Sequence, residues 1–139
     1  MNATPVLVSE NDLTAFARDC FMGAGVAETH ARRWAEVLVW ANLRGVDSHG
    51  VLRIPGYVDA LARGGFNATP KMEVTRREGA IALLDADAAP GPVGMCAAME
   101  EAITRAREVH LGWCAVRNVT HAGAVGYYAL MAVEAGMAG

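Results

Sequence analysis

The spacing of apolar residues divides the chain into a helical first half and a mixed second half. Up to about residue 66, apolar side chains recur every three or four positions, as they do on the buried face of a helix. This spacing predicts helices over 9–23 and 27–45 and a third over about 50–65. Ser9 is the expected N-cap of the first helix, and Pro55 is expected in the first turn of the third helix or at a kink there.

Beyond residue 70 the pattern changes to strands that alternate with helices. We expect strands at 72–76, 80–85 and 113–117, helices at 93–110 and 122–135, and a loop at 89–92. The sequence therefore predicts a mixed α/β (α+β) chain. A helical domain over residues 1–70 is followed by the first strands and helices of a sheet domain over 71–139.

Composition narrows the class of protein. The hydrophobic fraction is 53% and the charged fraction 19%, so the chain either packs tightly or covers apolar surface with something else. A net charge of −3 offers no basic surface for nucleic acid. Neither a secretory signal nor a membrane-spanning apolar run is visible. Three cysteines without a C-x-x-C pair predict free thiols and a cytoplasmic location.

The first candidate site lies after the second predicted helix, where Ser48 and His49 are adjacent and Arg53 follows. Histidine exchanges protons near neutral pH, and the arginine fork suits a carboxylate. If a helix begins at Gly50, His49 and Arg53 lie one turn apart and can face one cleft. A substrate with a hydroxyl or keto group beside a carboxylate needs both side chains.

A purely structural reading of this stretch is also open. Asp47 or Ser48 can serve only as an N-cap, with His49 half-exposed in a turn and Arg53 solvated. The motif is too short for spacing alone to decide between the two readings.

The second candidate site begins at His121, where small residues occupy 122–126 before the last predicted helix. Small residues allow the backbone or a phosphate of another molecule to approach, and a helix N-terminus attracts anions. The helix dipole would also favour a neutral imidazole at His121. Small residues at a helix start can equally serve helix–sheet packing, so this alternative stays open.

Other site types lack a signal in the sequence. No pair of histidines, cysteines or carboxylates has metal-ligand spacing, so no metal is expected. The Rossmann fingerprint G-x-G-x-x-G is absent as well.

Together, the two candidate sites resemble the type-2 malate/L-lactate dehydrogenase family, which includes ureidoglycolate, sulfolactate and 2,3-diketogulonate dehydrogenases and piperideine-carboxylate reductases. The first block is Leu-Arg-Gly-Val-Asp-Ser-His-Gly at 43–50, followed by Arg53 and Tyr57. The second block is Asn118-x-x-His121-x-Gly123-x-x-Gly126-Tyr127-Tyr128. The resemblance extends from about residue 8 to the last residue.

The resemblance implies a dimeric oxidoreductase with a non-Rossmann fold. Such an enzyme transfers a hydride between NAD or NADP and a 2-hydroxy or 2-oxo acid, or a cyclic 2-imino acid. His49 would be the acid/base, oriented by Ser48, and Arg53 would bind the substrate carboxylate. Tyr57 would line the substrate pocket. His121 and the residues after it would contact the cofactor, and His121 could instead be the acid/base; the contacting residues are Ala122, Gly123, Ala124 and Val125.

Two departures from the family qualify this expectation. Family members often carry Asn-Ser-Asn-His-Phe-Gly where this chain has Ala122 after the histidine, which would alter cofactor packing. They are also more than twice as long, so the resemblance covers an N-terminal portion only. The alternative, from another class, is a non-catalytic module that pairs through a sheet edge and apolar helix faces.

Overall fold

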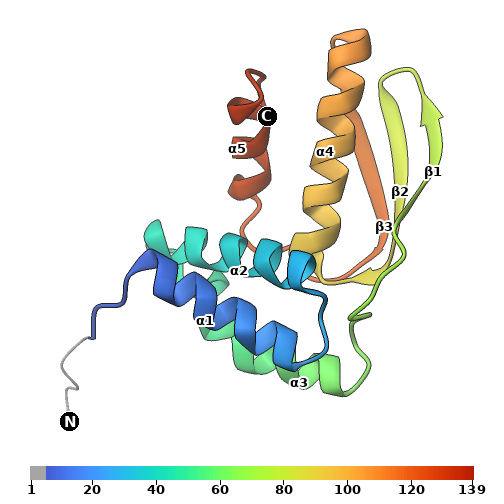
Figure 1. The fold of residues 1–139 in the computed structure, drawn as a ribbon. Helices are drawn as coiled ribbons and strands as arrows, with labels where there is room; N and C mark the ends of the chain where they lie inside the picture. Colours follow the sequence, from blue (N-terminus) through green and yellow to red (C-terminus); the bar gives the residue numbers. More distant parts are fainter. Residues whose placement is uncertain (1–5) are drawn as a thin grey trace.

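The computed structural model describes residues 6–139, which form helices followed by a small sheet (Figure 1). The helices are α1 (Glu10–Gly23), α2 (Glu28–Leu43), α3 (Ile54–Ala62), α4 (Gly91–Val109) and α5 (Gly126–Glu134). The strands are β1 (Glu73–Glu78), β2 (Ile81–Ala89) and β3 (Trp113–Val119). The predicted mixed fold, with helices first and strands from about residue 70, is confirmed.

Local signals set the ends of the first helices. The Ser9 hydroxyl accepts a hydrogen bond from the Asp12 N–H and so caps α1 as predicted. Pro55 lies in the first turn of α3, where its missing N–H leaves no helical bond unmade. These boundaries follow from chemistry within a few residues.

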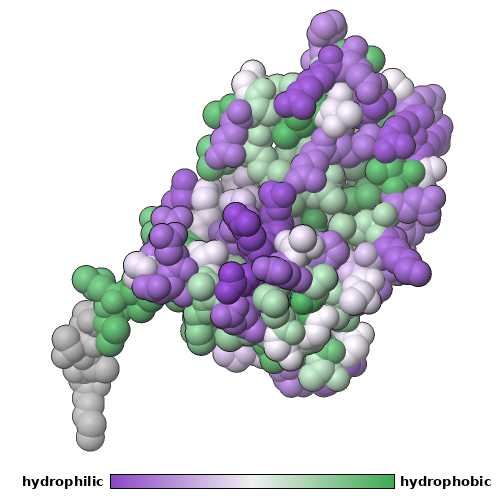
Figure 2. Space-filling model, in the orientation of Figure 1, coloured by the Kyte–Doolittle hydropathy of each residue, from purple (hydrophilic) through white to green (hydrophobic). Residues whose placement is uncertain are grey.

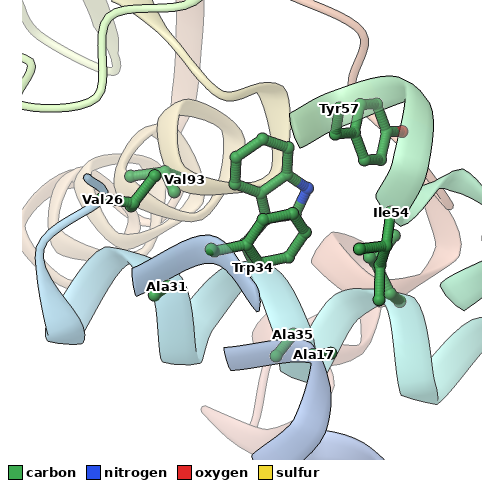
Figure 3. Packing of buried hydrophobic residues seen from close by; sticks show 10 residues of the cluster. Ala17, Val26, Ala31, Trp34, Ala35, Ile54, Tyr57 and Val93 are labelled. Atoms are coloured by element: carbon green, nitrogen blue, oxygen red, sulfur yellow. The ribbon is translucent and has the colours of Figure 1, made fainter. Parts of the chain in front are cut away.

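The helices α1, α2 and α3 share one core centred on Trp34, which is 0% exposed. Its indole stacks on Phe21 with ring centroids 4.0 Å apart and packs against Tyr57 at 5.0 Å. Figure 3 shows Tyr57 and Ile54 on one side of this indole and Val93, from the start of α4, on the other. The core therefore brings α3 and the beginning of α4 to the same place.

The sheet has the order β1-β2-β3, in which β2 pairs antiparallel with β1 and parallel with β3. The connection between the parallel strands is α4, which lies between the sheet and α5 in Figure 1. Alternate residues of β2, namely Ala82, Leu84 and Ala86, are buried. A Cβ at Gly94 would lie 2.9 Å from Val119 Cγ2, so this glycine lets α4 approach the sheet.

Three predicted boundaries are wrong. Residues 50–53 do not begin an α-helix, because two short 3-10 turns, Asp47–His49 and Val51–Arg53, precede α3. The loop expected at 89–92 is the end of β2 and the first turn of α4. The last helix begins at Gly126 instead of 122, since the positive φ of +72° at Gly123 is incompatible with a helix.

Apolar side chains also lie on the surface. Leu7 is 97% exposed, and Figure 2 shows a green, hydrophobic segment next to the grey terminus. On the sheet face turned away from α4, Ile81 and Trp113 pair in register and are 59% and 68% exposed. No helix within residues 6–139 has the length and apolar character to cross a bilayer.

Candidate functional site

Two segments far apart in the sequence meet at the site, the turns at 47–53 and the loop at 120–125. They bring His49 and His121 together, with ring centroids 5.8 Å apart and an angle of 28° between the ring planes. The two imidazoles belong to separate sequence motifs, and the fold places their rings side by side at one site.

The His49 side is built from the two 3-10 turns. The Ser48 hydroxyl lies 2.9 Å from Nδ1 of His49, which leaves Nε2 as the ring nitrogen open to a ligand. The Arg53 Nε donates to the Ser48 carbonyl at 2.7 Å, so the guanidinium is held beside the same turn. No carboxylate pairs with Arg53 anywhere in residues 6–139.

Asn42, in the last turn of α2, organises these turns, and sequence reasoning missed it. Its Oδ1 accepts from the Val51 N–H at 2.9 Å, and its Nδ2 donates to Asp47 at 2.6 Å. A Cβ at Gly50 would lie 2.2 Å from Asn42 Oδ1, so the amide needs a glycine there. The only sequence signal was a polar residue in an otherwise apolar helix end, five positions before Asp47.

The His121 side is tied to α3. Tyr57 places its hydroxyl 3.0 Å from Nδ1 of His121, and the Gly123 N–H donates to the same nitrogen at 3.3 Å. Both contacts suit an Nδ1 that accepts, with the ring proton on Nε2. Burial raises the pKa of Tyr57, which keeps its hydroxyl protonated and able to donate.

Electrostatics favours the neutral form of His121. Partial burial lowers its pKa, and the positive charges of Arg53 and His49 lower it further. The expected cause, the dipole of a helix starting at 122, is wrong because α5 begins at Gly126. The cause is tertiary contact with groups from the other segment.

The small residues of the loop divide into two groups. Gly123 and Ala124 are buried. A Cβ placed on Gly123 would lie 3.6 Å from Cγ of Pro92. The φ of +72° at Gly123 also requires glycine. In contrast, Val125 is 67% exposed, Ala122 is half-buried and His121 is exposed. Part of this loop of small residues therefore serves packing, and His121, Ala122 and Val125 remain at least partly accessible to a ligand.

A metal centre has no support in the described part of the chain. No group of three or more histidine, cysteine or carboxylate side chains lies close enough to hold an ion there. The cysteines Cys20, Cys96 and Cys114 are free, and burial raises the pKa of the Cys96 thiol to about 12. None of these thiols lies in the site.

Comparisons with known proteins agree with one another. Residues 8–139 match the sequence model of the family described as malate/L-lactate dehydrogenase. Malate dehydrogenase of Pyrococcus abyssi is 42% identical over 134 residues, which are 96% of this chain and 37% of that protein. Ureidoglycolate dehydrogenase (NAD(+)) of Escherichia coli K12 is 33% identical over 95% of this chain and 38% of its own length.

A solved structure gives the same result for the fold. Malate dehydrogenase from Pyrococcus horikoshii OT3 superposes with a TM-score of 0.91 at 41% identity, covering 94% of this chain and 38% of that one. The chain thus spans little more than a third of the length of the relatives it matches. Both the sequence match over residues 8–139 and the superposition lead to one conclusion: this chain belongs to the malate/L-lactate dehydrogenase family.

Proposed function

We propose that the protein containing this chain is an NAD- or NADP-dependent oxidoreductase that interconverts a 2-hydroxy acid and its 2-oxo acid. The relatives support the general class, since their names include malate and ureidoglycolate dehydrogenases. The observation that carries the proposal is the 5.8 Å separation of the His49 and His121 rings beside the Arg53 guanidinium.

This arrangement suits the chemistry of the substrate. Removal of a hydride from a carbon that bears a hydroxyl requires the hydroxyl proton to leave as well, and an imidazole near neutral pH can take it. One of the two histidines is the proposed acid/base. The neutral state of His121 suits a base for alcohol oxidation, while Ser48 orients His49 for the same task.

Arg53 is the proposed partner of the substrate carboxylate. Its backbone bond to Ser48 uses Nε and leaves the rest of the guanidinium fork for a ligand. A carboxylate bound there would fix which face of the reacting carbon is presented for hydride transfer. Tyr57, whose ring lies in the core and whose hydroxyl reaches His121, is the proposed wall of the substrate pocket.

The nicotinamide cofactor supplies the hydride chemistry when it is bound. From this chain we assign it the exposed residues His121 and Val125 and the half-buried Ala122, with Gly123 and Ala124 shaping the loop from beneath. We also propose a homodimer in the cytoplasm, a location supported by the free thiols. We also propose a domain boundary near residue 70, between α3 and β1.

Ligand titration of the isotope-labelled chain tests the substrate site. Pyruvate and L-malate are expected to shift the imidazole resonances of His49 and His121 in the wild type and not in Arg53→Gln. Arg63→Gln is the matched control, because Arg63 is also exposed and near a helix end but pairs with Asp59. Binding that is unaffected by Arg53→Gln would contradict the carboxylate role.

Turnover measured on the full-length protein that contains this chain decides which histidine is the acid/base. We expect an alanine variant of that histidine to lower kcat by about 10²–10⁴-fold with little change in cofactor affinity. The alanine variant of the other histidine should change binding more than kcat. Full turnover by both variants with every 2-oxo acid tried would refute the assignment.

A second candidate function is that of a non-catalytic module that pairs with another copy of itself. Two observations favour it: the exposed Trp113 and Ile81 on the open sheet face, and a groove of about 670 Å³ between α4, α5 and the start of β3. Sedimentation velocity distinguishes the candidates. A dimer that Trp113→Lys dissociates, together with no binding of NADH, favours the module, whereas NADH binding favours the enzyme.

A further inference from the structure

Thr120, the residue before His121, joins the site loop to the start of α4. Its hydroxyl accepts a hydrogen bond from the Gly91 N–H at 2.9 Å and donates one to the Ala89 carbonyl at 3.1 Å. Its own N–H donates to the same carbonyl at 3.4 Å. One half-buried side chain thus holds both sides of the β2–α4 junction.

Gly91 lies directly against the same loop. A Cβ on this buried residue would be 1.9 Å from the His121 carbonyl oxygen and 2.8 Å from Ala122 Cα. No side chain fits into that space, and both neighbouring atoms are backbone, which cannot rotate away. The first turn of α4 therefore touches the His121 peptide itself.

These contacts fix the peptide from which the imidazole projects. The ring then reaches the Tyr57 hydroxyl at 3.0 Å and lies 5.8 Å from the His49 ring. Because Nδ1 of His121 is the atom that meets Tyr57, a small shift of the peptide would break that contact and change the position of the ring relative to Tyr57 and His49.

We propose that Thr120 and Gly91 are positioning residues for His121, acting through its peptide. The hydroxyl of Thr120 anchors the loop, and the missing side chain of Gly91 lets α4 press against it. The consequence for turnover rests on the proposed acid/base chemistry, whereas the position of the ring does not. The competing role is purely structural, since the Thr120 hydroxyl also satisfies an N–H that the first turn of α4 leaves free.

The titration of His121 separates the two roles. In Thr120→Val, which removes the hydroxyl and keeps the shape, we expect the pKa of His121 to rise toward the ordinary histidine range. The reason is that the ring would lose burial and move away from Arg53 and His49. Thr120→Ser should restore the wild-type titration. The pKa is read from the imidazole carbon-bound proton resonances, assigned among the four histidines with His121→Gln.

Thr104→Val is the matched control, because the Thr104 hydroxyl also donates to a backbone carbonyl, that of Glu100 at 2.9 Å, on an exposed face of α4. It should leave the His121 titration unchanged. Gly91→Ala, which keeps every hydrogen-bonding side chain, should raise the pKa of His121 and serves if Thr120→Val does not fold. An unchanged pKa in the folded variants, or unfolding of both, overturns the proposal in favour of a structural role.

In the active protein, Thr120→Val should lower kcat more than it changes KM, and Thr120→Ser should recover kcat. If the pKa shifts as expected but no 2-hydroxy acid is oxidised, the positioning inference holds and the proposed function fails. If a 2-hydroxy acid is oxidised but the pKa of His121 does not shift, the proposed function holds and the positioning inference fails.

Discussion

The hydroxyl of Tyr57 lies 3.0 Å from Nδ1 of His121 and joins α3 to the loop that follows β3. Tyr57 is only 7% exposed, and its ring centroid lies 5.0 Å from that of the central Trp34 indole. Its hydroxyl is therefore held in place by the helical core. The packing of three helices in this way sets the position of an imidazole 64 residues further along the chain.

Tyr57→Phe tests this link, because it keeps the ring and removes only the hydroxyl. We expect the free energy of unfolding to fall by about 0.5–1.5 kcal/mol, the usual net value of one hydrogen bond. The His121 resonances should shift, while those of His110, at the far end of α4, should not. Urea denaturation and proton–carbon correlation spectra measure the two effects, and unmoved His121 resonances would contradict the link.

Asn42→Ala should loosen the turns that carry His49. The substitution leaves the half-buried Val51 N–H without its acceptor, at a cost of about 1–3 kcal/mol in unfolding free energy. Asn11→Ala is the control, since Asn11 is exposed on α1. Faster amide hydrogen exchange confined to residues 47–53 is the expected local sign, and equal stability of the two variants would show that the Asn42 amide is dispensable.

Gly50→Ala should be destabilising for a reason other than backbone strain. The φ of −94° and ψ of −155° at Gly50 are open to alanine, so the loss must come from the new Cβ, placed 2.2 Å from Asn42 Oδ1. Gly56→Ala, in α3 with nothing within 4 Å of its Cβ, should instead stabilise the chain by about 0.5–1 kcal/mol. Thermal melts of the two variants should move in opposite directions.

Mild acid should destabilise the chain through His121 and His30. Burial lowers the pKa of each below the ordinary histidine value, so the unfolded state binds more protons as the pH falls through that range. The stabilising contribution is present above pH 6.5, the unfolded value, and is lost as the pH falls toward the folded pKa values. Urea midpoints measured from pH 8 to pH 5 should decline, and the decline should be smaller in His121→Gln. A decline of the same size in that variant would remove His121 from the explanation.

Much of the fold is encoded locally. The Ser9 cap, the Pro55 turn and the apolar stripe around Trp34 set α1, α2 and α3, because a cap, a fixed φ and a buried face act over a few residues. The first half of the site is local for the same reason. Ser48, His49 and Arg53 lie within six positions, so neighbouring turns alone can bring them together.

Tertiary contacts decided the rest. The last helix begins at Gly126 and not at 122, because Gly123 takes a positive φ and the Tyr128 hydroxyl occupies the Ala122 carbonyl. The lowered pKa of His121, which favours its neutral form, comes from burial and from Arg53 and His49, not from a helix dipole. The sequence by itself determined which residues are the candidates for the chemistry and where α1 and α2 begin. Only the folded chain decided that His121 meets Tyr57 and His49, since the hydrogen bonds and packing that hold it there join segments with no local signal for each other.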